Sequence, residues 1–404
     1  MNQRDKAIAF FRNPDSQSLA KSRFAAYYFG LYLKIIKSVR DRFKRNSRIV
    51  YLDLFSGAGK YGTGTESVPL KVLSSAKGIS NIYFHFNDLF LADQLEENIK
   101  KKFHFETLPS NIVVTKEDAQ ALKIKRLFNS DDIVLSYVDS FGYKLCDVNT
   151  INQLISNPFS DTLIFLNTEH FYRFIDYGNE KLSYVKFFGS EENLNHFQEE
   201  YKKEPCKDKV TLELIRDFVK RLNRFHGSAL CYFPVFFRKS ESGSHITQIL
   251  LLISKDPTGI NRIREMFTEV DKEQDDKGKR NQNFYFEDGR MTVYVDKSRN
   301  QTSLFPDEED FDKYKGILKY IGASKEEGIN VPELLKRIDN ACIKRSGYMS
   351  GYTAVFLKRA LTYFELKKQI IVDYRGRTKR RGDSWGEKTY FYRNTKEDSH
   401  EDHH

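Results

Sequence analysis

The sequence predicts an α/β protein built on a mostly parallel sheet with helices on both faces. Two observations support this fold class: short apolar runs alternate with helical stretches between residues 48 and 167, and the first run leads directly into a cluster of glycines. Strands that alternate with helices form parallel sheets, because each helix carries the chain back across the sheet. At 404 residues the chain has room for two or three domains.

The first predicted element is one long N-terminal helix. From Ser18 to about Asn46, apolar residues recur at helical spacing, and basic residues close the stretch. Residues 1–50 contain twelve Lys or Arg against three Asp or Glu, a net charge of +9, compared with +10 for the whole chain. The N-terminal segment, expected to span residues 1–47, holds most of this charge and is compatible with a polyanionic partner.

Seven strands are expected in the next domain, residues 48–270. Helical stretches such as Ala92 to Phe103 separate the first five. A polar turn from Glu241 to Ser244 joins the last two, which are expected to form an antiparallel hairpin that closes the sheet. The seven runs are IVYLDLF, NIYFHFNDL, NIVVTKED, DIVLSYVD, TLIFLN, ALCYFPVFFRK and HITQILLLIS.

A second, smaller module is expected at residues 311–394. Residues 271–310 are polar, which is typical of a linker or lid. After Phe311 come three helical stretches and then two strand candidates around a basic, glycine-containing tip. This order indicates a winged helix-turn-helix module. The charged residues 395–404 are expected to be a disordered tail.

Composition narrows the class of protein. The four cysteines are scattered and form no CxxC pair, so neither a zinc ribbon nor a disulfide framework is expected, and no metal site is assigned. A reducing, cytoplasmic compartment fits this cysteine usage. The longest apolar run, Ile249 to Ile253, is far shorter than the ~20 residues of a membrane span, and the N-terminus lacks the apolar core of a signal peptide.

The densest chemical signal lies between Val50 and Gly64, where a buried strand runs into four glycines. Glycines allow sharp turns and let a ligand approach the backbone. A phosphate-binding P-loop is excluded because Leu54 replaces its first glycine and Tyr61 replaces its Ser or Thr. The GxGxxG pattern of dinucleotide-binding proteins fits loosely, but Asp53 at the strand end suits a cationic or polar ligand better than a pyrophosphate.

This segment resembles motif I of the Rossmann-like S-adenosylmethionine (SAM) methyltransferases, whose DLFxGxG pattern stands here at Asp53 to Gly59. The resemblance implies SAM as the cofactor. Asp88, after the second strand, matches the acid that binds the ribose hydroxyls, and Asp118, after the third, matches a position near the adenine amine. The cofactor-binding residues implied in this way are Asp53, Phe55, Gly57, Gly59, Asp88 and Asp118.

Asp139 ends the fourth strand, where many nucleic-acid methyltransferases carry an Asp-Pro-Pro-aromatic motif. A carboxylate there can orient an amine or take its proton, and the aromatic Phe141 can stack on an extruded base. Together with the Ser140 hydroxyl, these residues are the expected catalytic set; a simple turn is the alternative. Glu169 and His170, after the next strand, are second candidates for acid–base chemistry.

A narrower resemblance is to the three-Cys-motif partner protein (TcmP) family and covers roughly residues 20–270. It rests on DLFSGAG, DSFG at Asp139 to Gly142, LNTEHFYR, FFGSEENL and the late strand pair. The chain departs from the family where Ser140 and Ala58 replace prolines. The resemblance implies a neighbouring partner protein that carries three cysteines.

A second basic cluster occupies the predicted wing tip and is expected to contact nucleic-acid phosphates, with a solvated loop as the alternative. Its members are Arg375, Arg377, Lys379, Arg380 and Arg381. Two functions stay open: a SAM-dependent methyltransferase that acts on or binds nucleic acid, and a catalytically inactive subunit of the same fold that binds nucleic acid or a partner in phage defence or a mobile element. A dinucleotide-dependent oxidoreductase is the weakest reading, since no second catalytic His or Lys set is evident.

Overall fold

The computed structural model describes most of the chain. The described residues are 5, 8, 11–12, 16–43, 47–140, 147–174, 181–204, 206–226, 230–238, 245–257, 259–261, 263–264, 284–287, 290–294, 308–324, 327–373 and 389–394. Within these ranges no helix combines the length and the apolar character needed to cross a membrane.

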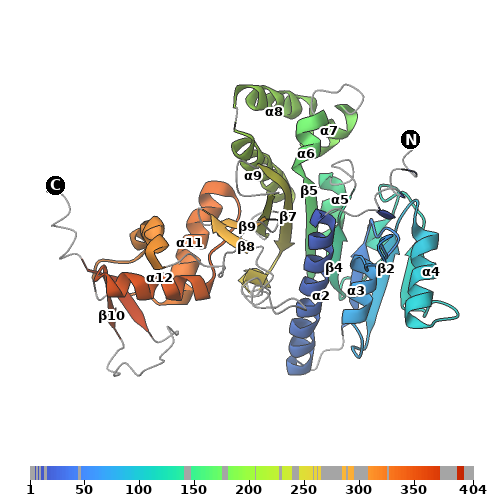
Figure 1. Cartoon of the computed structure of the whole chain (residues 1–404), viewed down its shortest axis with the longest axis horizontal. Helices are drawn as coiled ribbons and strands as arrows, with labels where there is room; N and C mark the ends of the chain where they lie inside the picture. Colours follow the sequence, from blue (N-terminus) through green and yellow to red (C-terminus); the bar gives the residue numbers. More distant parts are fainter. Residues whose placement is uncertain are drawn as a thin grey trace. The chain divides into compact units, whose positions relative to one another are not determined.

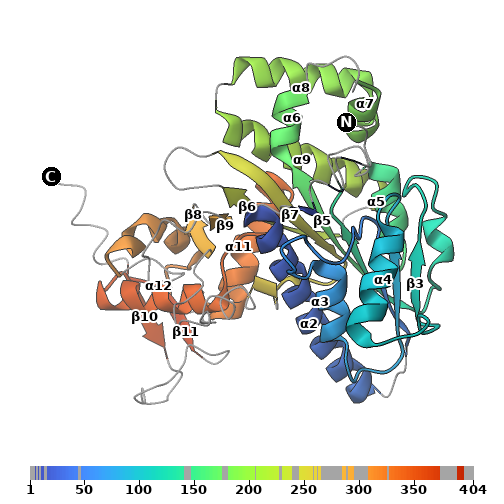
Figure 2. The ribbon, with the colours of Figure 1, turned by 45° about the vertical axis from the view of Figure 1, so that its right-hand side comes forward.

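The chain divides into two compact units. The first comprises Met1–Tyr232, Phe236–Pro257 and Tyr294–Asp296, and the second comprises Phe233–Val235, Thr258–Val293 and Lys297–His404. Each unit is described separately below. The chain is drawn in Figure 1, and in Figure 2 after a turn about the vertical axis.

Seven strands of the first unit form an α/β sheet in the order β3-β2-β1-β4-β5-β7-β6. Neighbours among the first five strands pair in parallel, whereas β7 runs antiparallel to β5. The mostly parallel sheet expected from the sequence is therefore confirmed. The strands are β1 (Ile49–Asp53), β2 (Ile82–Asn87), β3 (Ile112–Thr115), β4 (Ile133–Val138), β5 (Ser160–Asn167), β6 (Cys231–Arg238) and β7 (Ile246–Ser254).

The strand order reverses between β1 and β4. From β1 the chain builds outward to β2 and β3, then returns to place β4 on the other side of β1. The register sets Asp53 at the end of β1 beside Tyr137 of β4. In open α/β sheets a ligand binds beyond the carboxyl ends of the strands at such a reversal.

The long N-terminal helix α2 (Ser16–Phe43) has one face in the core, and its bounds are close to those expected. Phe24, Tyr28, Phe29 and Leu33 recur at helical spacing and are buried. Phe29 contacts Tyr51 of β1 edge-on, with ring centroids 4.9 Å apart. In Figure 2, α2 (dark blue) runs alongside α3 (Val68–Ser75). The buried aromatic and aliphatic side chains of α2 anchor this helix against the sheet.

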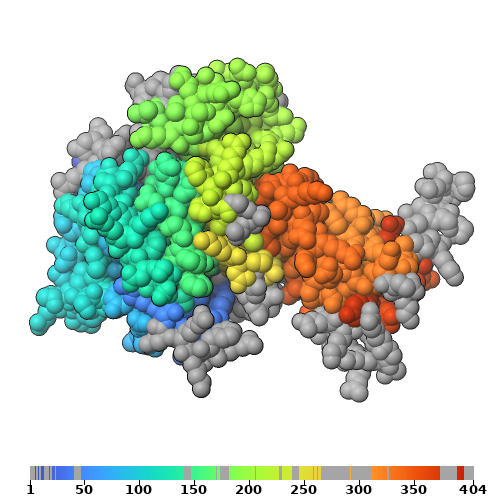
Figure 3. Space-filling view, turned by 180° about the vertical axis from the view of Figure 1, so that it is seen from behind, coloured from blue at the N-terminus to red at the C-terminus, as the bar shows by residue number. Residues whose placement is uncertain are grey.

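Further helices among the described residues of the first unit connect the strands. They are α4 (Ala92–Phe103), η1 (Ile124–Arg126), α5 (Val148–Leu154), α6 (Thr168–Phe174), α7 (Lys181–Phe188), α8 (Glu191–Lys203) and α9 (Lys207–His226). Asp147 caps α5 by accepting the Thr150 amide at 2.9 Å. Seen from behind, residues coloured cyan to green form a continuous surface (Figure 3). Helices and sheet together enclose the apolar core of this unit.

The C-terminal part combines a helical group with strand pairs. The segment expected to be a linker or lid contains an antiparallel pair, β8 (Phe284–Glu287) and β9 (Arg290–Tyr294). Then follow η5 (Glu308–Tyr320), α11 (Val331–Ser346), α12 (Ala354–Leu366) and the antiparallel pair β10 (Ile370–Asp373) and β11 (Tyr390–Arg393). Ile329, between η5 and α11, forms an antiparallel bridge with Phe391 of β11.

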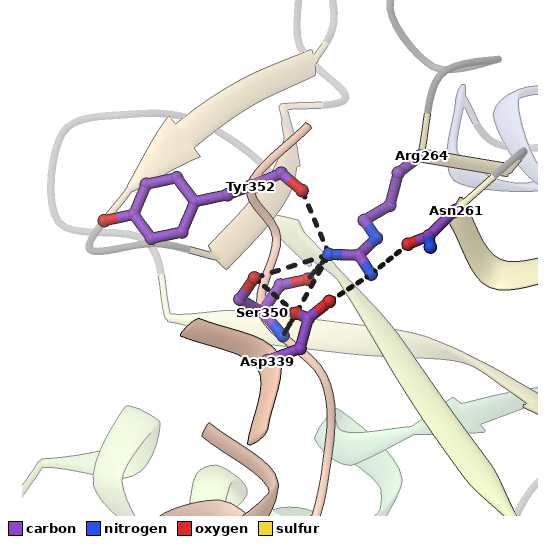
Figure 4. Close-up of polar contacts among 5 residues, drawn as sticks. All are labelled: Asn261, Arg264, Asp339, Ser350 and Tyr352. Atoms are coloured by element: carbon purple, nitrogen blue, oxygen red, sulfur yellow. Dashed lines mark hydrogen bonds and ion pairs between the residues drawn. The ribbon is translucent and has the colours of Figure 1, made fainter. Parts of the chain in front are cut away.

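A buried ion pair holds the second unit together (Figure 4). Arg264 donates to both carboxylate oxygens of Asp339, at 3.0 and 2.7 Å, and the two side chains are only 1% and 6% exposed. The same guanidinium donates to the backbone carbonyls of Ser350 and Tyr352 and to Asn261 Oδ1. Ser350 in turn donates its amide and hydroxyl to Asp339 Oδ1, at 3.0 and 2.7 Å. The network joins α11 to the loop before α12.

Candidate functional site

The glycine loop follows β1 and contains backbone that only glycine adopts easily. Gly57 and Gly59 have φ of 64° and 76°, in the left-handed region. A Cβ on Gly59 would lie 2.6 Å from the side chain of Leu95, so the loop packs closely on α4. The backbone conformation therefore favours glycine at both positions, and packing against Leu95 is a second reason at Gly59.

Asp88 ties the end of β2 to this loop. Its Oδ2 accepts the Gly57 amide at 2.9 Å, while Oδ1 accepts the amides of Phe90 and Leu91 at 2.9 and 2.8 Å. The carboxylate thus shapes both the glycine loop and the turn that leads into α4. Oδ2 has a further lone pair with which it can accept a hydrogen bond from a ligand hydroxyl.

Asp53 is a buried carboxylate with one oxygen free among the described residues. Its Oδ1 accepts the Phe55 amide at 3.1 Å, but Oδ2 is buried and has no hydrogen-bond partner within the part of the chain described. Burial raises the pKa of Asp53 well above its ordinary value, and the nearby carboxylates of Asp139 and Asp88 raise it further. A cationic group that bound at Oδ2 would reverse this effect and stabilise the ionised carboxylate.

Asp139 follows β4 and contacts a residue from the N-terminal helix. Lys21 Nζ lies 3.0 Å from its Oδ1, and the Tyr137 hydroxyl donates to its Oδ2 at 3.2 Å. Ser140 is buried beside it, whereas Phe141 lies outside the described residues. The carboxylate is therefore held from two sides next to the end of β1.

Asp118 is placed differently from the other three acids. It is exposed in the loop after β3, and its Oδ1 accepts the Gln120 amide at 3.0 Å within a local turn. The electrostatic contacts of Asp53 include Asp88 and Asp139. The ends of β1, β2 and β4 thus bring three of the expected acids together, while the geometry of Asp118 is that of a turn residue.

Asn87, which the sequence reasoning passed over, organises the same edge. Its amide nitrogen donates to the carbonyls of Leu54 and Glu117, at 3.2 and 3.0 Å. Its oxygen accepts the Thr115 hydroxyl at 2.9 Å and the Glu117 amide at 3.1 Å. One buried side chain thereby fixes the ends of β1, β2 and β3. The available signal was a polar residue directly after the apolar residues of a strand.

The N-terminal segment also covers the glycine loop. Gly62 donates its amide to the Phe11 carbonyl at 2.7 Å, and the Phe11 ring stacks on Tyr61 with centroids 5.4 Å apart. A Cβ on Gly57 would lie 1.8 Å from that ring. Only tertiary contact reveals this role, because nothing in the local pattern around Phe11 points to the loop.

Several other expected residues have a partial description or none. Glu169 is half-buried at the start of α6, but the side chain of His170 is not described. The basic cluster of the predicted wing tip also lies outside the described residues. Within the described part of the chain, no group of three His, Cys, Asp or Glu side chains is arranged to hold a metal ion.

Comparison with solved structures finds distant likenesses. No family model matches the chain, and no curated protein matches it significantly. A Legionella pneumophila protein of family DUF519 aligns with 61% of this chain and 90% of its own at 10% identity and a TM-score of 0.37. The plantazolicin methyltransferase BpumL, in complex with a triazolic desmethylPZN analogue and SAH, aligns with 62% of this chain and 95% of its own at 12% identity and a TM-score of 0.30. The N-terminal domain of human METTL16 covers 55% of this chain and 67% of its own at 10% identity and a TM-score of 0.27.

Proposed function

We propose that this chain is a SAM-dependent methyltransferase of the TcmP type that acts on nucleic acid. The observation that carries the proposal is the buried Oδ2 of Asp53 at the reversal between β1 and β4, which has no hydrogen-bond partner among the described residues. The glycine loop and Asp88 lie on one side of it, and Asp139 lies on the other. This arrangement supports a ligand that is cationic at one end and carries hydroxyls at the other.

SAM fits that arrangement chemically. Its ammonium and sulfonium groups are cations that suit the acids at the ends of β1 and β4, and a ribose hydroxyl suits the spare lone pair on Asp88 Oδ2. Asp53, Gly57 and Gly59 would hold the amino-acid end, with Asp118 assigned to the adenine by resemblance alone. When bound, SAM supplies an already activated methyl group, so the protein has only to position donor and acceptor.

Asp139 is assigned the acceptor side of the reaction. Its carboxylate can accept a hydrogen bond from an acceptor amine and take the proton that the amine loses. The hydrogen bond from the Tyr137 hydroxyl holds Oδ2 of this carboxylate at the end of β4. Ser140 and Phe141 complete the proposed catalytic set, the latter as a stacking surface for a base.

Titration calorimetry with S-adenosylhomocysteine (SAH) and SAM tests the cofactor assignment. The full chain is expected to bind both, and Asp53→Ala is expected to weaken binding at least about tenfold, because it removes the buried carboxylate. Asp93→Asn is the matched control, since Asp93 is an exposed acid on α4 that pairs with Lys116. Absence of SAM and SAH binding to the native chain would refute the proposal.

The nucleic-acid assignment draws on the C-terminal helices and strands. The order η5, Ile329, α11, α12, β10, β11, with Ile329 bridged to β11, supports a winged-helix module. On α12 an exposed stripe runs through Val355, Arg359 and Thr362 to Leu366, which is 71% exposed. A recognition helix presents such a face to the major groove.

Fluorescence anisotropy with a labelled DNA duplex and a labelled RNA tests this assignment. Binding is expected to weaken steeply between 50 and 200 mM salt, as phosphate contacts require. Gln at all five wing-tip Lys and Arg positions is expected to reduce both affinity and salt dependence. Lys202→Gln with Lys203→Gln, on the exposed end of α8, is the control. Affinity that is insensitive to salt would contradict the proposal.

Methyl transfer itself separates the enzyme from an inactive binding subunit. Labelled SAM is incubated with the full chain and with DNA, RNA or protein from a lysate, and Asp139→Ala serves as the inactive reference. SAM binding that survives Asp139→Ala, with no transfer by the native chain, would favour the binding subunit.

Co-expression with a neighbouring three-cysteine protein, followed by purification, tests the partner that the TcmP resemblance implies.

A further inference from the structure

A lysine lies on the core-facing side of α2. Lys21 precedes Phe24, Ala25 and Tyr28 by three, four and seven positions, so it shares the face on which those residues are buried. A lysine on such a face loses hydration and is tolerated where a partner compensates for that loss. Here the partner is Asp139, and the two side chains are 13% and 24% exposed.

The surroundings hold this pair in one arrangement. Lys21 Nζ lies 3.0 Å from Asp139 Oδ1 and 5.0 Å from the ring centroid of Phe165, within the range of a cation–π contact. Tyr137, which is buried, engages the other carboxylate oxygen. Because the apolar face of α2 is packed in the core, the helix holds Lys21 next to Asp139.

The pair lies beside two further acids, Asp53 and Asp88. Asp53 has a buried, unpartnered Oδ2 among the described residues, and the carboxylates of Asp139 and Asp88 both raise its pKa. Three acids therefore share the edge formed by β1, β2 and β4. The ammonium of Lys21 supplies positive charge directly at one of them, Asp139.

We propose that Lys21 is a positioning residue of the methyl-transfer site. Lys21 holds Asp139 in place and offsets its negative charge. It thereby limits the preference of the site for SAM over SAH. The inference rests on the proposed function. SAM carries a sulfonium charge that SAH lacks, so uncompensated acids favour SAM. With Lys21 in place, the affinities of cofactor and product are closer to one another.

Titration calorimetry on the full chain, with SAM and SAH as probes, tests the inference. Lys21→Met is expected to raise the ratio of SAM to SAH affinity about tenfold, because an opposing charge is removed from the acids. Lys21→Arg keeps the positive charge and is expected to leave the ratio of SAM to SAH affinity at its native value. Lys71→Met is the matched control, because Lys71 Nζ donates to Ser22 Oγ at 3.1 Å. A merely structural role would change the two affinities together and leave their ratio unchanged.

Two further measurements make the test decisive. The double variant Lys21→Met with Asp139→Asn loses both charges and is expected to return to the native affinity ratio. Without any ligand, acetylation of Lys21 by an N-hydroxysuccinimide ester, followed by mass spectrometry, is expected to be slow in the native chain and faster in Asp139→Asn. The exposed Lys203 provides the reference rate.

The outcomes separate this inference from the proposed function. An unchanged SAM to SAH ratio in Lys21→Met would overturn the role of Lys21, as would native acetylation as fast as that of Lys203. A native chain that binds neither SAM nor SAH would instead refute the proposed function and with it the effect on affinity. The acetylation rates would in that case still report whether Lys21 and Asp139 are paired.

Discussion

Replacing Arg264 with methionine is expected to destabilise the second unit by about 3–5 kcal/mol, the range for breaking a buried ion pair by removing one partner. The structure places this site in that class, because Arg264 is almost wholly buried and donates to both carboxylate oxygens of Asp339. The variant also removes the donor to the carbonyls of Ser350 and Tyr352. Within the described part of the chain, Asp339 is then left buried with the hydrogen bonds from Ser350 as its compensation.

Hydrogen–deuterium exchange with mass spectrometry measures this change locally. Peptides from α11 and α12 are expected to lose protection in the variant, whereas peptides from β1 to β5 in the first unit are expected to keep it. The double variant Arg264→Met with Asp339→Leu is expected to recover most of the loss, because no uncompensated charge stays buried. A loss below about 1 kcal/mol in the single variant would refute the reasoning, since a surface pair behaves in that way.

Three further predictions concern the first unit. Asn87→Ala is expected to lower the free energy of unfolding in urea by about 2–4 kcal/mol, because it leaves the buried groups at three strand ends unpaired. Burial, above all, raises the pKa of Asp161 to about 6 from 3.8, so native stability falls by up to about 3 kcal/mol as pH rises from about 4 to 6. Asp161→Asn is therefore expected to melt higher than the native chain at pH 7 and to match it near pH 4; an equal difference at both values would contradict this. Gly57→Ala is expected to lower the free energy of unfolding in urea by more than Gly78→Ala does. Both glycines have positive φ, which costs a residue with a side chain about 1–2 kcal/mol. A Cβ at position 57 would in addition clash with Phe11, whereas a Cβ at position 78 would meet nothing within 4 Å.

Much of the fold and part of the candidate site follow from local sequence. Apolar runs mark the strands because buried parallel strands need apolar residues on both faces. The glycines after β1 mark left-handed backbone, and the acids after β1, β2 and β4 come together because parallel strands end at one edge of the sheet. Asp118 ends a similar run, yet it lies in a local turn, and nothing in the pattern distinguishes it from Asp88.

The tertiary structure alone decided which distant residues meet. Lys21 and Asp139 are 118 positions apart, and Arg264 and Asp339 are 75 apart. A lysine or arginine in a helical stretch looks like an ordinary solvated side chain until packing turns its face towards the core. The strand order is of the same kind, because the reversal between β1 and β4 depends on long-range pairing. Sequence by itself determined the elements and the chemistry at their ends, because both are local properties; the partners of Asp139, Asp53 and Asn87 were decided by packing, because burial and charge compensation depend on the whole fold.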